Sequence, residues 1–183
     1  LEQGFPRNDL LAQPHPELGE KVRRALGLPP EKRLLLYAPT FRKDKGLAAY
    51  DMDYARCVRA LEQRFGGEWL LLAKLHPNIA EKAAQMNLDP QVVRNASDYP
   101  DIQELYLACD ALITDLAAYK SDRNFYYDID KLPFARAENN DQLEAALLEF
   151  DPQEQARRTE AFCREFGLVE SGTAAVQTVD YLE

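Results

Sequence analysis

The sequence predicts an α/β fold in which a doubly wound, Rossmann-like parallel sheet carries helices on both faces. Short runs of consecutive apolar residues alternate with longer amphipathic segments along the chain. The apolar runs end at proline or at polar residues, as strands buried on both faces of a parallel sheet do. The segments between several of them are long enough to serve as crossover helices, which parallel strands require.

Four apolar runs are interpreted as strands. Each is short and rich in large aliphatic residues, and turn-forming or polar residues follow it at once. The expected strands are Arg33–Ala38 (RLLLYA), Trp69–Leu75 (WLLLAKL), the short pair Val92–Val93, and Ala111–Thr114 (ALIT).

Seven segments show helical spacing or helix start and stop signals. Pro16 suits the first position of a helix, and Gly27 suits the position after its end. Asp101 places a negative charge at a helix N-terminus, where the helix dipole favours it. The expected helices are Pro16–Leu26, Asp53–Phe65, Ile79–Met86, Ile102–Cys109, Asp141–Phe150, Pro152–Phe166 and Thr173–Leu182.

Length and composition indicate one globular domain spanning residues 1–183 and exclude several classes of partner. The formal net charge is −9, so no nucleic-acid partner is expected, because phosphate backbones are bound by basic faces. No apolar run is long enough for a transmembrane segment. The widely spaced Cys57, Cys109 and Cys163 predict neither a disulfide framework nor a zinc site. Because the chain begins with Leu1, we expect it to be a piece of a longer protein.

Polar side chains follow three of the predicted strands, at the edge where open α/β sheets bind ligands. Thr40 and Arg42 follow the first strand, His76 follows the second, and Asp115 follows the last. Arg42 is suited to a bidentate phosphate contact or is a surface arginine. His76 is a loop histidine bonded to backbone, or it donates to a phosphate or acts as an acid. Asp115 caps the next helix, holds a substrate hydroxyl or orients His76.

A second candidate anion site is the turn Ser171-Gly172-Thr173, which opens the last helix. We expect free N–H groups and a hydroxyl to point outward there, although a simple serine cap explains the same residues. His15, between two prolines, is interpreted as structural. The sequence has no GxGxxG, Walker, HExxH or GxSxG motif and no metal-ligand cluster, so we expect no dinucleotide cofactor and no catalytic metal.

Several short segments occur together in a characteristic order. They are Gly4-Phe5-Pro6-Arg7-Asn8-Asp9, Tyr37-Ala38-Pro39-Thr40-Phe41-Arg42, Lys74-Leu75-His76-Pro77, Asp110-Ala111-Leu112-Ile113-Thr114-Asp115, Arg123-Asn124-Phe125-Tyr126-Tyr127-Asp128 and Ser171-Gly172-Thr173-Ala174-Ala175. In this order they resemble the CDP-glycerol glycerophosphotransferase family, the teichoic-acid primases and polymerases of Gram-positive bacteria.

The resemblance implies that this chain is the C-terminal, donor-binding half of a GT-B fold. The N-terminal half, with the acceptor site and catalytic base, would lie outside it, so no catalytic residue is expected here. The implied reaction transfers glycerol phosphate from CDP-glycerol to a lipid-linked polyol-phosphate acceptor and releases CMP. The implied donor-site residues are Arg42, His76, Ser171, Gly172 and Thr173, supported by Thr40, Asp115 and Arg123. We expect a cytoplasmic protein, peripheral at the inner face of the membrane in its full-length form.

The stretch after Asp115 departs from the family pattern. Only seven residues separate Asp115 from Arg123, which is too few for a crossover helix and a strand. We therefore hypothesise that a further stretch separates two segments of this sequence near Asp115–Leu116 in the complete protein.

Two other functions remain open at this point. One is half of a nucleotide-sugar glycosyltransferase of the same fold. The other is a non-catalytic nucleotide-binding or scaffold domain, which the short stretch after Asp115 favours.

Overall fold

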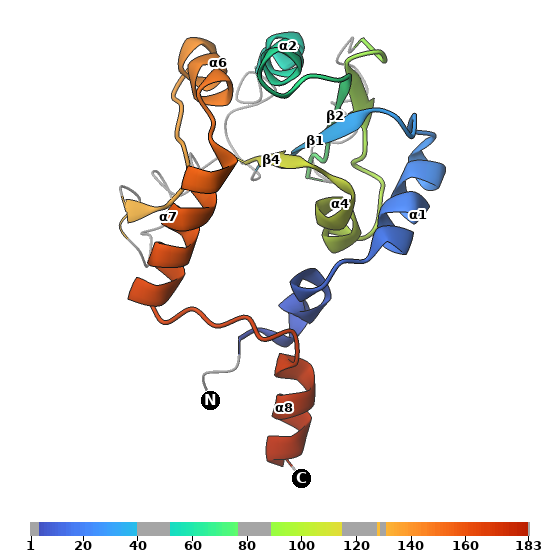
Figure 1. The fold of residues 1–183 in the computed structure, drawn as a ribbon. Coiled ribbons are helices and arrows are strands. Elements are labelled where there is room, and N and C mark those ends of the chain that lie inside the picture. The colour runs from blue at the N-terminus through green and yellow to red at the C-terminus, as the bar shows by residue number, and fades with distance from the viewer. Residues whose placement is uncertain (1–3, 40–51, 77–88, 115–127, 129–130, 183) are drawn as a thin grey trace.

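The computed structural model describes residues 4–39, 52–76, 89–114, 128 and 131–182 of the chain (Figure 1). Its elements follow the predicted alternation of helices and strands. They are η1 (Pro6–Ala12), α1 (Pro16–Leu26), β1 (Arg33–Tyr37), α2 (Tyr54–Phe65), β2 (Trp69–Ala73), β3 (Val93–Asn95), α4 (Ile102–Ala108), β4 (Ala111–Ile113), α6 (Asn140–Leu148), α7 (Pro152–Glu165) and α8 (Ala174–Leu182). The helix expected at Ile79–Met86 lies outside the described residues.

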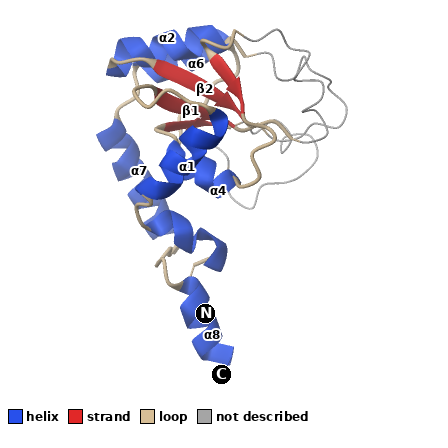
Figure 2. Ribbon diagram, turned by 90° about the vertical axis from the view of Figure 1, so that its right-hand side faces the viewer, coloured by secondary structure: helices blue, strands red, loops and turns tan. Residues whose placement is uncertain are grey.

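The strands within the described residues form one sheet in the order β3-β2-β1-β4. Every neighbouring pair is parallel: Leu35 of β1 lies opposite Leu71 of β2 and Ala111 of β4, and Leu71 lies opposite Val93 of β3. Because all pairs are parallel, the four strands end at the same edge of the sheet (Figure 2). The predicted parallel α/β sheet is confirmed.

The apolar runs of β1 and β2 are buried on both faces. Leu35 and Leu71 contribute to a core that includes Val58 and Leu61 of α2. Leu34 and Leu36 belong to a second core on the opposite face, beneath α1 and α4. Alternate residues of one strand thus enter two separate cores, because successive side chains of a strand point to opposite faces. Helices therefore cover both faces, as the doubly wound prediction requires (Figure 1).

Local capping explains where most of the helices begin and end. Asp53, Asp101 and Asp151 precede α2, α4 and α7, and each carboxylate accepts a hydrogen bond from a backbone N–H in the first turn. Gly27 ends α1 in the left-handed conformation, with φ of 60°, which costs glycine no steric strain. The bounds of α1 are as predicted, and those of α2, α4, α6, α7 and α8 differ by two residues or fewer.

Sequence periodicity predicted α8 but did not predict η1 or the contact between the two ends of the chain. Residues Pro6–Ala12 form the 3₁₀ helix η1, which no pattern in the sequence indicated. Helix α8 packs against η1 and extends away from the sheet in both views (Figures 1 and 2).

Helix α7 has no buried residue. None of the helices in the described part of the chain has the length and apolar character that crossing a bilayer requires.

The buried strand β1 should dominate stability. We expect Leu35→Ala to lower the free energy of unfolding by about 2–5 kcal/mol, because Leu35 is 0% exposed and its removal leaves a cavity. Leu112 of β4, the last in the order of the described strands, is 52% exposed, so Leu112→Ala should lower the free energy of unfolding by about 1 kcal/mol or less. Urea unfolding followed by circular dichroism measures both. Equal losses for the two variants would contradict the assignment of the core.

Candidate functional site

The carboxyl edge of the sheet is held together by hydrogen bonds that continue beyond the strands. The N–H of Ala38, just after β1, donates to the carbonyl of Ile113 at 3.0 Å, and the N–H of Lys74, just after β2, donates to the carbonyl of Tyr37 at 2.9 Å. The Thr114 hydroxyl donates to the Ala38 carbonyl at 2.8 Å. Segments that leave three different strands are therefore bonded side by side before they diverge.

The structure describes part of the predicted donor site. His76 is exposed and lies three residues beyond the end of β2, at this edge. Four predicted site residues lie outside the described residues: Thr40, Arg42, Asp115 and Arg123. The donor site that the family resemblance implies, with Arg42, His76 and Thr173 together, therefore stays a prediction.

Lys74 joins the loop after β2 to the loop after β3. Its Nζ donates to the carbonyl oxygens of Ser97 and Tyr99, both at 2.6 Å. The next N–H, that of Leu75, donates to Ser97 Oγ at 3.2 Å, a contact that is buried. Burial lowers the pKa of Lys74, since desolvation disfavours the charged ammonium, while the charge of Asp98 raises it in part. Lys74 belongs to the segment Lys74-Leu75-His76-Pro77, but no pattern in the sequence indicated this role.

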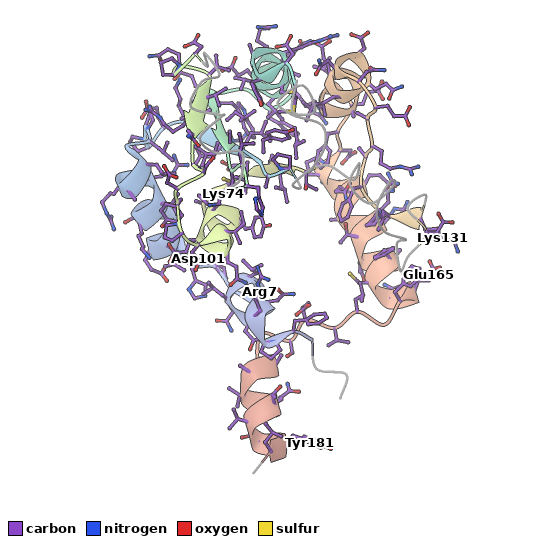
Figure 3. All side chains as sticks on the ribbon, turned by 180° about the vertical axis from the view of Figure 1, so that it is seen from behind. Arg7, Lys74, Asp101, Lys131, Glu165 and Tyr181 are labelled. Carbon is purple, nitrogen blue, oxygen red and sulfur yellow. The ribbon has the colours of Figure 1, made fainter. Side chains whose placement is uncertain are left out.

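A chain of polar contacts continues from Tyr99 to the helices beneath the sheet. The Tyr99 hydroxyl donates to Glu104 Oε2 on α4, and Lys21 Nζ on α1 donates to Glu104 Oε1 at 2.6 Å. The Lys21 ammonium, and next the Tyr99 hydroxyl, lower the pKa of Glu104. Burial, together with the bond to Glu104, raises the pKa of Tyr99 to about 12. Figure 3 shows Lys74 beside the sheet, with Asp101 at the start of α4 below it.

The Ser171-Gly172-Thr173 turn lies against η1. The two N–H groups that begin α8, those of Ala174 and Ala175, donate to the two carboxylate oxygens of Asp9 at 2.9 and 2.8 Å. The expectation that these N–H groups are free is therefore wrong, because Asp9 binds them from 165 residues away. Ser171 Oγ accepts from the N–H of Thr173 at 3.2 Å, which is a local turn contact.

Two glycines allow the chain ends to approach this closely. A Cβ on Gly4 would lie 2.4 Å from the carbonyl oxygen of Val169, and a Cβ on Gly172 would lie 2.8 Å from Ala12 Cβ. Gly4 and Gly172 also have φ of 80° and 72°, in the region that side chains disfavour. Beside them, Glu170 accepts from the N–H of Phe5 at 3.3 Å and from Asn8 Nδ2 at 2.8 Å. The start and the end of the chain therefore form one joint, which we call the terminal joint (residues 4–12 and 169–175).

An open hollow in the described part of the chain does not suit a phosphate. It has a volume of about 370 Å³ and lies between η1, α4 and β4. Its lining is mostly apolar and includes Leu11, Tyr106 and Leu112. The lining carboxylate of Asp110 accepts the N–H of Leu34 at 2.9 Å, a structural contact to β1. The hollow therefore offers apolar surface and a carboxylate, and a carboxylate repels phosphate.

Cys57, Cys109 and His15 fit structural roles. Burial raises the pKa of Cys57 to about 11 and that of Cys109 to about 12, so both thiols stay protonated at neutral pH. Across the described residues, no group of three or more histidine, cysteine, aspartate or glutamate side chains is placed to hold a metal ion. His15 Nδ1 lies 3.0 Å from Glu17 Oε1 at the start of α1, which fits its structural interpretation.

We expect Asp9 to hold the start of α8. Asp9→Ala removes both acceptors and should lower the stability of α8 by about 0.5–2 kcal/mol, the usual effect of losing a helix cap. Asp9→Asn keeps one carbonyl oxygen and should have an intermediate effect. Amide hydrogen exchange of residues 174–182 measures this, with the β1 amides as the internal reference. Unchanged exchange in Asp9→Ala would show that the cap does not stabilise the helix.

The sequence of this chain is similar to a known protein family. A family model described as CDP-Glycerol:Poly(glycerophosphate) glycerophosphotransferase matches residues 1–118. The teichoic acid glycerol-phosphate transferase of Staphylococcus aureus is 32% identical over 143 residues, covering 72% of this chain and 36% of the relative. The teichoic acid poly(glycerol phosphate) polymerase of Bacillus spizizenii is 27% identical over 210 residues, covering 100% of this chain and 52% of the relative.

A solved structure is also similar. A variant of the wall teichoic acid polymerase TagF, soaked with CDPG, has a TM-score of 0.71 and 28% identity, covering 99% of this chain and 51% of that chain. The chain thus spans about half the length of these proteins or less. The 210-residue alignment is longer than this 183-residue chain, so that relative carries residues without a counterpart here. The stretch hypothesised near Asp115 falls outside the described residues.

Proposed function

Because the chain belongs to the CDP-glycerol:poly(glycerophosphate) glycerophosphotransferase family, we propose that it binds CDP-glycerol as the donor half of such an enzyme. The family match, which includes β1, β2 and His76, carries this proposal. The similar polymerase structure that was soaked with CDPG supports the same ligand. The proposed domain organisation is one donor-binding domain over residues 1–183, with the acceptor site and the base in a second domain of the complete protein.

The carboxyl edge of the sheet is the proposed donor site. Parallel strands direct their carboxyl ends to one crevice, where open α/β sheets bind nucleotides. His76 is exposed at this edge and can donate a hydrogen bond to the diphosphate of CDP-glycerol. Arg42, Thr40, Asp115 and Arg123 are proposed partners on the strength of the family resemblance.

The Ser171-Gly172-Thr173 turn is also a proposed part of this site. The N–H groups of the next two residues, Ala174 and Ala175, already donate to the Asp9 carboxylate. A phosphate contact from this turn would therefore use groups of residues 171–173, while Asp9 continues to accept the N–H groups of the first turn of α8.

The proposed reaction transfers a phosphoryl group between oxygens. A hydroxyl oxygen of the polyol-phosphate acceptor attacks the phosphorus that carries the glycerol of CDP-glycerol. A new P–O bond forms as the bond to CMP breaks, and the hydroxyl proton passes to a base in the other domain. The attack builds negative charge on the phosphoryl oxygens, and fixed donors such as Arg42 and His76 would stabilise that charge.

Calorimetric titration tests the proposed ligand. We expect the chain to bind CDP-glycerol in preference to UDP-glucose. His76→Ala and Arg42→Ala should each weaken binding by roughly 1.5–3 kcal/mol, the usual loss for a hydrogen bond to a charged group. His15→Ala is the matched control, because His15 is the other histidine of the chain and pairs with Glu17 instead. Preference for UDP-glucose would favour a nucleotide-sugar transferase, and binding of neither would favour a scaffold domain.

We also expect the isolated chain to have no transferase activity. The proposed base and acceptor site lie outside its sequence, so bound CDP-glycerol would have no activated nucleophile. Release of CMP from CDP-glycerol, measured chromatographically with a poly(glycerol phosphate) acceptor, is the assay. Catalytic turnover by the 183-residue chain would show that it contains its own base.

A further inference from the structure

Lys74 lies just after β2, two residues before His76, and the proposed mechanism gives it no task. A lysine beside a phosphate site is commonly a phosphate ligand. In this structure its ammonium group already donates to the Ser97 and Tyr99 carbonyls, both at 2.6 Å. Two of its three donors are therefore used within the protein.

The two carbonyls belong to a tight turn that follows β3. The N–H of Tyr99 donates to the carbonyl of Ala96 at 3.1 Å, which closes the turn. Ser97 and Tyr99 are both buried, so their carbonyl oxygens have restricted access to water. Buried carbonyls need donors, and the Lys74 ammonium supplies both.

Further bonds fix the same two loops to each other. The N–H of Ala96 donates to the carbonyl of Ala73 at 2.9 Å. The N–H of Leu75 donates to Ser97 Oγ at 3.2 Å. Residues 73–75 and 96–99 thus form one hydrogen-bonded unit, which we call the loop clamp, and His76 is the next residue of the chain.

We propose that Lys74 is a positioning residue, whose ammonium group holds the loop clamp and thereby sets the place of His76 at the carboxyl edge, without itself touching the ligand. For donor binding, this inference rests on the proposed function. The positioning of His76 is a property of the ligand-free chain and can be measured separately. The burial that lowers the pKa of Lys74 agrees with an ammonium group turned into the protein.

NMR of the two histidine rings tests the proposal in the complete 183-residue chain without ligand. We expect Lys74→Met to shift or split the ring signals of His76 and to leave those of His15 unchanged. Lys32→Met is the matched control, because Lys32 is also a largely buried lysine, with its ammonium 3.9 Å from Glu68 at the opposite edge of the sheet. It should leave both histidines unchanged. If Lys74 served only as a direct phosphate ligand, the uncharged change Ser97→Ala, which loosens the loop clamp, would leave the His76 signals unchanged in the ligand-free chain.

Two further variants keep the test decisive if Lys74→Met does not fold. Lys74→Gln retains an N–H donor on a shorter side chain, and Ser97→Ala removes the hydroxyl that binds the Leu75 N–H. Both should move the His76 signals in the ligand-free chain. Unchanged His76 signals in the folded variants would overturn the proposal, including the case in which CDP-glycerol binding is weakened.

Titration with CDP-glycerol then separates the two proposals. Lys74→Gln should raise the dissociation constant about tenfold, as loss of about one hydrogen bond does. If the unaltered chain does not bind CDP-glycerol but the His76 signals respond to the Lys74 variants, the proposed function fails and the positioning role stands. If the chain binds CDP-glycerol and the signals do not respond, the positioning role fails and the proposed function stands.

Discussion

The central constraint on this structure is the burial of β1 and β2 on both faces. Each strand contributes alternate large side chains to two separate cores, so neither face can be left to water. Helices must then lie above and below the sheet, and the connections that bring them there keep the strands parallel. Parallel strands in turn direct all loops that follow them to one edge. The position of His76 and Lys74 at this edge follows from the apolar runs that precede them.

Charged side chains that bind backbone groups fix segments that the sheet alone does not position. Lys74 donates to two carbonyls beyond β3, and Asp9 accepts from two N–H groups at the start of α8. In each case one charged group serves two peptide groups of a distant segment that the regular elements leave without partners. These contacts are stronger than neutral hydrogen bonds and fix the relative positions of the segments that they join.

The sequence predicted the elements better than it predicted their long-range polar contacts. The unbroken leucines of β1 and β2, the prolines and the aspartate caps are local signals, and the elements they predict are present. The placement of His76 at the carboxyl edge followed from the same signals. The Asp9 cap of α8 could not be predicted, because it joins residues 165 positions apart and leaves no periodicity. The role of Lys74 depends on how the turn at residues 96–99 folds back, which strand patterns do not specify.

The terminal joint sets a limit on where this domain can be divided. Residues 4–12 lie close to the backbone of residues 169–175, with Gly4 and Gly172 at the points of nearest approach. A genetic fusion or truncation that removes either segment also removes the partner of the other, although the two segments are more than 150 residues apart in the sequence. A recombination event that exchanged this domain between proteins would therefore have to carry residues 4–12 and residues 169–175 together to keep the terminal joint intact.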